Sequence, residues 1–291
     1  MNGAAITSSA ITVVNALPTG IGCAIGIGLH VSAQVEITVG GSSSPTVLEI
    51  PEASRSPVVD GSLRTALARF LPGENVTARL TLTSEIPVAR GLKSSSAVST
   101  AIVRAVARAS GRHPAHLEVG RCAAEITRQV GVSATGALDD ALAGLASGFV
   151  LTDNFRGEVL KRSDVAPGLG VALYVPERTH PPSPDLRGAF ARERDAGEEA
   201  VAAAQNGDWP RAMRLNSTLV ERTMGYPYGE LRARLERHGA VACGVSGLGP
   251  AVAAVAPTDM LPELLRLFPA DSAQRLIVPF TRGPGTDPEV A

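Results

Sequence analysis

Residues 87–97 read PVARGLKSSSA and place a glycine, a lysine and three consecutive serines between a strand-like and a helix-like stretch. These residue types suit the binding of an anion. Gly91 has no Cβ and lets a ligand approach the backbone closely. The serines at 94–96 fall where the first turn of a helix presents free N–H groups and the positive end of its dipole. Lys93 adds a compact positive charge, so the pattern indicates a phosphate-binding site.

The serine hydroxyls could also donate hydrogen bonds to phosphate oxygens or bind Mg²⁺. A simpler interpretation is that they cap a helix, but one serine would be enough for that. The segment is not a Walker A motif, which has Gly directly before the lysine and another Gly five residues earlier. Leu92 and Pro87 occupy these two positions. It also lacks the glycine pattern of a protein kinase.

A second group with chemical potential is the carboxylate pair Asp139 and Asp140 in the segment ALDDALAG (137–144). Adjacent residues on a helix point about 100° apart, so both carboxylates cannot face one site equally. Their neighbours are small and apolar, and a carboxylate on a buried face is costly without a partner. We therefore expect one aspartate to serve a functional site, and the other to cap the helix or to face solvent.

The elements around these residues follow from hydrophobic periodicity. Residues 76–83 alternate apolar and polar side chains and predict a strand, and residues 97–110 have the period of a helix. The serine segment thus joins a strand to a helix. The same reasoning predicts strands at 6–14, 30–39, 148–152 and 171–176 and helices at 59–71, 115–130 and 135–144, with a glycine-rich segment at 16–28 and a turn at 40–45.

The C-terminal portion has its own pattern. The cluster PPSP at 181–184 predicts an exposed connection, and helices are expected near 186–205, 208–223 and 229–238. A strand, a glycine turn, a second strand, a helix (259–268) and a last strand then follow. Together with the strand at 171–176, this order predicts a βαββαβ, ferredoxin-like layout. We place the boundary between two domains near residue 165.

Composition limits the kind of protein. Of the 291 residues, 44% are hydrophobic and only 3% are aromatic, which predicts a globular core of small aliphatic side chains. The net charge is −1, without the basic excess of nucleic-acid-binding proteins, so we expect no nucleic-acid partner. Lys93 and Lys161 are the only lysines in a chain rich in arginine. Keeping a lysine at position 93 suggests a need for a compact point charge.

Three cysteines, at positions 23, 122 and 243, are scattered and form no C-x-x-C pair, which predicts a reducing compartment without disulfides. No apolar run approaches the roughly 18 residues of a membrane span. We therefore expect a cytoplasmic protein with no membrane partner. His113 and His116 have a proline between them and no obvious third ligand, so we expect no zinc site.

The loop pattern P-x-x-x-G-L-x-S-S-x-A resembles the nucleotide loop of the galactokinase, homoserine kinase, mevalonate kinase and phosphomevalonate kinase (GHMP) superfamily. The lysine form GLKSSSA, together with the segment TGALDDA, is similar to the archaeal-type shikimate kinases. Four segments match family segments in the right order: 15–28, 87–97, 125–141 and 246–251. The resemblance implies a two-domain α+β fold, with a ribosomal S5 domain 2-like N-terminal domain (1–164) and a ferredoxin-like C-terminal domain (165–291).

The resemblance also implies roles for individual residues. The loop residues that would bind ATP are Pro87, Arg90, Gly91, Leu92, Lys93, Ser94, Ser95, Ser96 and Ala97. Ser95 and Glu125 would bind the metal, although Glu125 could equally be a surface residue that pairs with Arg121 or Arg128. Asp139 aligns with the family's catalytic base and a one-residue shift would make it Asp140, while Lys93 would neutralise phosphate charge. The acceptor contacts would come from Asn15, Thr19, Ser246 and Gly247.

The implied activity is ATP- and Mg²⁺-dependent phosphorylation of a hydroxyl of shikimate to give 3-phosphoshikimate, a step of aromatic amino-acid biosynthesis. A cationic clamp for the shikimate carboxylate is expected, from an arginine that the sequence does not identify, and a homodimer is left open. Two alternatives stay open: another acceptor alcohol, such as homoserine, a mevalonate-type alcohol or a cyclitol, or a kinase-like sensor without activity. Binding of nucleic acid through the S5-like domain is disfavoured by charge and by the scarcity of aromatic residues.

Overall fold

A computed structural model describes residues 1–40, 45–146, 148–177 and 185–281. The N-terminal part contains a mixed sheet in the order β3-β4-β2-β5-β6, with β1 paired to the other edge of β2. The long β2 pairs with β4 along its second half and with β5 along its first. The strands are β1 (Asn2–Val14), β2 (Ile21–Val39), β3 (Val47–Glu49), β4 (Val76–Ser84), β5 (Phe149–Asp153) and β6 (Glu158–Ser163).

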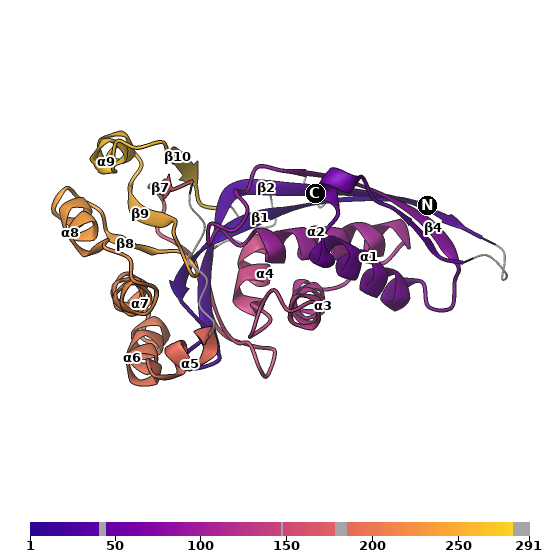
Figure 1. The fold of residues 1–291 in the computed structure, drawn as a ribbon, viewed down its shortest axis with the longest axis horizontal. Coiled ribbons are helices and arrows are strands. Elements are labelled where there is room, and N and C mark those ends of the chain that lie inside the picture. The colour runs from indigo at the N-terminus through magenta and orange to yellow at the C-terminus, as the bar shows by residue number, and fades with distance from the viewer. Residues whose placement is uncertain (41–44, 147, 178–184, 282–291) are drawn as a thin grey trace.

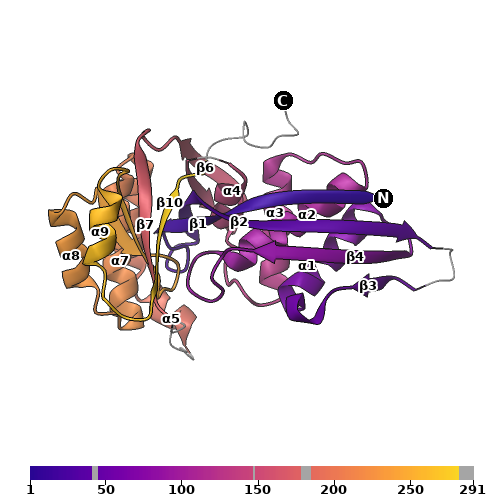
Figure 2. The same ribbon diagram turned by 90° about the horizontal axis from the view of Figure 1, so that it is seen from above.

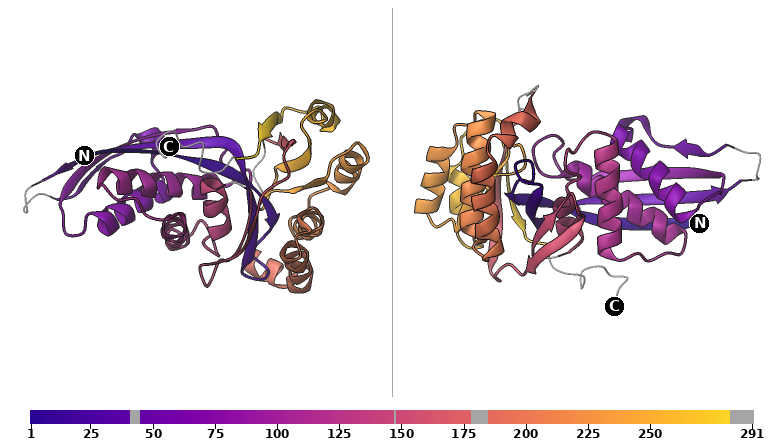
Figure 3. Two further views of the ribbon diagram at one scale, coloured as in Figure 1. Left: turned by 180° about the vertical axis from the view of Figure 1, so that it is seen from behind. Right: turned by 90° about the horizontal axis from the view of Figure 1, so that it is seen from below.

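Four helices lie on one face of this sheet, with α2 and α4 against the strands and α3 packed on the other helices, as the views from the side and from below show (Figures 1 and 3). Their inward-facing side chains are mostly alanine, valine, leucine and isoleucine, in agreement with the aliphatic core expected from composition. The helices are α1 (Pro57–Phe70), α2 (Ser94–Ala109), α3 (His116–Gln129) and α4 (Leu138–Leu145), and a 3-10 turn (Glu52–Ser54) precedes α1.

The C-terminal part is an antiparallel sheet in the order β10-β7-β9-β8, seen edge-on beside the first sheet in Figure 2. Its strands are β7 (Leu169–Val175), β8 (Ala242–Val245), β9 (Val252–Pro257) and β10 (Gln274–Pro279). The helices are α5 (Leu186–Ala191), α6 (Arg194–Gln205), α7 (Trp209–Met224), α8 (Gly229–Arg237) and α9 (Leu261–Leu267). This order of strands and helices confirms the ferredoxin-like prediction, with a four-helix connection between β7 and β8.

Strand β1 connects the two parts of the molecule. Its register against β2 shifts between Ser8 and Ser9 and again between Thr12 and Val14. Such bulges bend a strand, and β1 and β2 curve toward the C-terminal part in Figure 1. The end of β1 therefore lies where the two parts meet. β6 and β7 lie in different sheets, while the division of the chain at residue 165 stays a prediction.

The glycine-rich segment at 16–28, for which no strand was predicted, is mostly part of β2. Only its first residues form a turn, and β2 begins at Ile21. A Cβ at Gly22 would lie 2.6 Å from the carboxylate of Asp139, and one at Gly26 would lie 2.2 Å from the carbonyl oxygen of Ala143. These glycines allow α4 to approach the strand closely, which explains a glycine-rich sequence in a strand.

The remaining elements agree with the predictions to within a few residues, with four differences. β1 begins four residues earlier than expected, β3 and β6 were not expected, and the helix predicted near 186–205 is two helices, α5 and α6. The PPSP cluster lies outside the described residues. Within the part of the chain that the structure describes, no helix is both long and apolar enough to cross a bilayer.

Candidate active site

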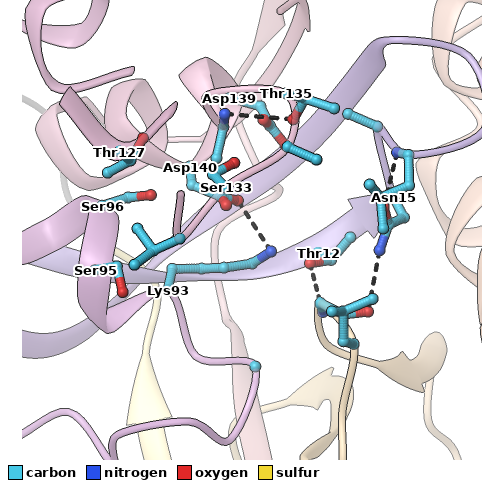
Figure 4. A pocket seen from close by; sticks show the side chains of 18 of the residues that line it. Thr12, Asn15, Lys93, Ser95, Ser96, Thr127, Ser133, Thr135, Asp139 and Asp140 are labelled. Carbon is cyan, nitrogen blue, oxygen red and sulfur yellow. Dashed lines mark hydrogen bonds and ion pairs between the residues drawn. The ribbon is translucent and has the colours of Figure 1, made fainter. Parts of the chain in front are cut away.

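A cavity of about 690 Å³ lies where the two parts of the molecule meet (Figure 4). Its walls come from the loop before α2, the end of α3, the start of α4, the end of β1, the start of α5 and the turn after β8. The predicted site residues in its wall are Asn15, Pro87, Gly91, Leu92, Lys93, Ser94, Ser95, Ser96, Asp139, Asp140 and Gly247.

The start of α2 forms one wall of this cavity. The first helical hydrogen bond in α2 is donated by the N–H of Ala97 to the carbonyl of Lys93, at 3.0 Å. The N–H groups of residues 94–96 precede it and therefore have no acceptor within the helix. Since these three residues line the cavity, their N–H groups and the helix dipole create a site suited to an anion.

Hydrogen bonds from two other elements hold this loop in place. The hydroxyl of Ser9 on β1 donates to the carbonyl of Leu92 at 2.7 Å, and that of Ser246 donates to the carbonyl of Gly91 at 2.8 Å. Gly91 has φ +84°, and a Cβ there would lie 2.0 Å from the carbonyl oxygen of Ser246. Only glycine fits this contact, so the loop and the turn after β8 form one packed unit.

Among the residues that the structure describes, three that are not glycine have a left-handed backbone: Ala89 (φ 57°), Lys93 (φ 61°) and Ala137 (φ 52°). All three line the cavity, and Lys93 and Ala137 are the N-caps of α2 and α4. This conformation costs roughly 1–2 kcal/mol per residue for an L-amino acid. Such strain concentrates at functional sites, so three strained residues in its wall indicate that the cavity is a functional site.

Lys93 crosses the cavity toward the start of α4 (Figure 4). Its Nζ lies 3.2 Å from Oδ1 of Asp140, and the two side chains are 13% and 7% exposed. Burial raises the pKa of Asp140, while the ammonium of Lys93 and its contact with the carboxylate lower it. Lys93 is the N-cap of α2, so its ammonium adds a positive charge beside the free N–H groups of this helix.

Asp139 has a different environment. Its Oδ1 accepts a hydrogen bond of 2.9 Å from Nδ2 of Asn154, which follows β5. Burial, and then the charge of Asp140, raise the pKa of Asp139 to about 7, against the opposing effects of Lys93 and Asn154. A carboxyl group with a pKa near neutrality can accept and release a proton at physiological pH.

The sequence matches a family model described as "GHMP kinases N terminal domain" over residues 61–148. It is also 38% identical to a shikimate kinase of Pyrococcus furiosus over 270 residues, which covers 92% of this chain and 97% of that protein. The chain belongs to the GHMP kinase superfamily, in the branch of the archaeal shikimate kinases. A shikimate kinase of Thermococcus kodakarensis is 40% identical over 86% of this chain and 91% of that protein.

Solved structures with this fold are more distant in sequence. A mevalonate kinase superposes with a TM-score of 0.73 over 96% of this GHMP kinase and 99% of that chain, at 14% identity. This likeness confirms the two-domain α+β fold.

Several predicted residues lie elsewhere or have other partners. Glu125 is exposed on α3, accepts a hydrogen bond of 3.0 Å from Gln129 and does not line the cavity. Thr19 is also outside the lining, and its hydroxyl accepts from the N–H of Ile21. Arg90 and Ala97 do not line the cavity either: Arg90 donates to the carbonyls of Val88 and Glu177, and the carbonyl of Ala97 accepts from Thr7.

The polar groups of the predicted acceptor-binding residues are mostly engaged in hydrogen bonds within the protein. The hydroxyl of Ser246 also accepts from the N–H of Thr12 at 3.2 Å, and Ser246 is fully buried. Nδ2 of Asn15 donates to the carbonyl of Gly247 at 3.2 Å, and its Oδ1 accepts from Leu17. These residues therefore join the two parts of the molecule, and Asn15 and Gly247 also line the cavity.

The sequence analysis missed Thr12, Asn154, Arg128 and Arg187. Thr12 lies at the end of a strand whose alternation predicts only burial, and Asn154 follows β5 with no motif around it. Arg128 and Arg187 line the cavity and, together with Lys93, are its basic side chains among the described residues. Arg128 follows Glu125 by three residues and was considered only as a possible partner of that glutamate, not as a residue of the site.

The residues that line the cavity could hold Mg²⁺ only if the bound ligand supplies most of the oxygen atoms that coordinate the metal. Among the described residues there is no group of three or more His, Cys, Asp or Glu side chains that could hold a metal ion. Mg²⁺ commonly uses few protein ligands and completes its shell with phosphate oxygens and water. The exposed hydroxyl of Ser95 in the first turn of α2 is the group that fits this role.

Proposed function

We propose that this GHMP kinase transfers the γ-phosphoryl group of ATP to a hydroxyl of shikimate and releases 3-phosphoshikimate and ADP. The proposal depends on one observation: a single cavity contains both a helix N-terminus suited to an anion and a buried carboxyl group with a pKa near 7. Identity of 38–40% to shikimate kinases over most of the chain supports the choice of acceptor.

The residues at the start of α2 would bind the nucleotide phosphates. Phosphoryl transfer depends on positioning and on neutralisation of phosphate charge more than on covalent chemistry. The N–H groups of residues 94–96 and the ammonium of Lys93 would contact phosphate oxygens. Ser95 would hold Mg²⁺, which when bound neutralises phosphate charge.

Asp139 would act as the base. The acceptor oxygen forms a bond to the γ-phosphorus while the bond from that phosphorus to the bridging oxygen of ADP breaks. The proton of the acceptor hydroxyl passes to the carboxylate of Asp139, whose pKa of about 7 permits this at physiological pH. Burial raises the pKa of Asp140 as well, but its carboxylate is already paired with Lys93, which supports Asp139 as the proton acceptor.

The shikimate carboxylate needs a cationic partner. Arg128 at the end of α3 and Arg187 on α5 line the cavity and are exposed there. We propose that one or both bind this carboxylate, because Lys93, the other basic side chain among the described lining residues, would contact the phosphates. Arg128→Gln and Arg187→Gln should then raise KM for shikimate by about tenfold or more, with little change in KM for ATP.

The test is a coupled assay of ADP release with shikimate, homoserine, mevalonate and a cyclitol as acceptors, with and without Mg²⁺. We expect shikimate alone to raise the rate well above the rate with water. A rate that rises with another alcohol and not with shikimate would refute the acceptor. ATP binding without ADP release for any of these acceptors would favour a sensor instead. The location in the cytoplasm, the homodimer and the domain boundary stay predictions.

A further inference from the structure

We propose that Asn154 is a positioning residue that holds the carboxylate of Asp139 for proton transfer, so that Asp139 and not Asp140 serves as the base. The assignment of a base rests on the proposed function, whereas the effect of Asn154 on Asp139 does not. Asn154 is 4% exposed and does not line the cavity, so it would act through Asp139 and not on the substrate.

The hydrogen bonds of Asn154 fix the orientation of its amide. Oδ1 accepts from the hydroxyl of Thr152 at 2.6 Å and from the N–H of Asp139 at 3.4 Å. The backbone N–H of Asp139 can only donate, so the oxygen must occupy this position, where the hydroxyl of Thr152 also donates to it. Nδ2 must then point to Oδ1 of Asp139, at 2.9 Å. The amide thus binds both the backbone and the carboxylate of the same aspartate.

The same side chain also holds the segment that leads into α4. Nδ2 lies 3.3 Å from the hydroxyl of Thr135, two residues before the left-handed Ala137. Gly22 on β2 also lies against the carboxylate, since a Cβ there would be 2.6 Å from Asp139. The carboxylate of Asp139 therefore contacts both β2 and Asn154, which limits its freedom to rotate.

The charged and titratable groups that act on Asp139 come from three elements. They are Asp140 on α4, Lys93 at the start of α2 and Cys23 on β2, where burial keeps the thiol neutral by raising its pKa. Burial and Asp140 oppose ionisation of Asp139, and Lys93 is engaged by Asp140. Like a backbone N–H, the side-chain amide of Asn154 donates to the carboxylate and favours its ionised form. Its loss should therefore raise the pH at which Asp139 becomes a base.

The experiment compares Asn154→Ala and Asn154→Asp with the wild type over the pH range of activity, using shikimate and ATP. Removal of the donor should lower kcat by about ten- to a hundredfold and change KM for shikimate by less than about threefold. The acid limb of the kcat profile should move to higher pH in the alanine variant. It should move further in the aspartate variant, because a second carboxylate repels the charge on Asp139. Asn154→Asp also keeps the shape of the side chain, in case the alanine variant does not fold.

Ser62→Ala is the control for a purely structural effect. It removes a buried hydrogen bond of 3.0 Å between Ser62 and Ser99, away from the cavity lining. It should lower stability and leave the acid limb in place. The proposal is overturned if both Asn154 variants keep the wild-type acid limb and merely lose stability as Ser62→Ala does.

A second readout does not need the kinase reaction. The pKa of Asp139 can be followed through the pH dependence of thermal unfolding, measured for Asn154→Ala with and without Asp139→Asn. We expect Asn154→Ala to shift this pH dependence, and the shift to vanish when Asp139 is absent. If the wild type releases no ADP with shikimate, the proposed function fails. The unfolding data then still decide whether Asn154 controls the ionisation of Asp139, and an unchanged profile refutes it.

Discussion

Asp139 and Asp140 are adjacent in the sequence, yet one accepts from the amide of Asn154 and the other pairs with Lys93. This difference predicts opposite effects of Asp139→Asn on activity and stability. Loss of the base should lower kcat by about a hundredfold or more. The same change should stabilise the protein at pH 8, since it removes a buried charge that the folded state disfavours.

The direction follows from the pKa of Asp139, which is 3.8 in the unfolded chain and about 7 in the folded one. Between these pH values the folded state binds more protons, so this group makes the protein less stable as pH rises. Asp139→Asn removes the penalty, which at pH 8 is worth about 2 to 4 kcal/mol. Thermal unfolding at pH 4 and pH 8 measures it: the variant should gain stability over the wild type at pH 8 and little at pH 4. A variant less stable than the wild type at pH 8 would contradict a raised pKa for the buried carboxyl group of Asp139.

Lys93 supplies an ammonium group to the cavity but has a left-handed backbone conformation, with a φ of 61°, that glycine adopts at a lower cost. Lys93→Gly and Lys93→Ala both remove the ammonium, so both should lower kcat by about a hundredfold and leave Asp140 without its ion pair. The glycine variant should be the more stable of the two by about 1 kcal/mol, which reverses the usual helix preference for alanine. Urea unfolding of the two variants measures this difference. An alanine variant of equal or higher stability would show that the left-handed conformation is not kept in solution.

At the scale of elements, the contact between the loop before α2 and the turn after β8 depends on Gly91. Gly91→Ala should cost more than about 2 kcal/mol and raise KM for ATP by about tenfold or more, because the added Cβ lies 2.0 Å from a backbone oxygen. Gly73→Ala is the matched control. Gly73 also has a positive φ (+79°) but has nothing within 4 Å of its Cβ position. It should cost about 1 kcal/mol and leave KM for ATP unchanged; equal effects on KM would refute a special role of the contact.

The elements that the sequence predicts well are those whose signals are local. The alternation in 76–83 and the period of 97–110 correspond to β4 and α2 because each buries one face against the same core. The first half of β2 was missed because its glycines resemble a turn, and their reason is the approach of α4, which is distant in sequence. Glu125 was assigned to the site from the family resemblance alone. In the structure it is exposed, whereas Val119, Cys122 and Ile126 form the buried face of α3.

The site itself shows the same limit. The loop at 87–97 and the aspartate pair were predicted because their residue types are unusual where they occur, and residues of both line the cavity. Asn154 and Thr12 were not predicted, because their contacts, with Asp139 and with Gly247, depend on how the chain folds and leave no local motif. Which aspartate is the base also depends on such contacts, since adjacent residues differ only in the partners that the fold gives them.

At the scale of the whole molecule, the cavity exists only because the two sheets are joined at the end of β1. The hydroxyl of Thr12 accepts from the N–H of Gly247 at 2.8 Å, and both groups are buried. Thr12→Val keeps the shape of the side chain and leaves this N–H without a partner, which costs about 1 to 3 kcal/mol. We expect KM for ATP and for shikimate to rise together, because residues from both parts line the cavity.

Tyr174→Phe separates this effect from a general loss of stability. It removes the hydrogen bond of 2.5 Å from Tyr174 to Asp271 in the C-terminal part, outside the wall of the cavity. Steady-state kinetics and thermal unfolding of both variants should show a loss of stability in each and a rise of both KM values only in Thr12→Val. A rise of one KM alone would mean that the two substrates depend on different parts of the molecule. The Thr12–Gly247 hydrogen bond would then hold the turn without setting the geometry of the whole cavity.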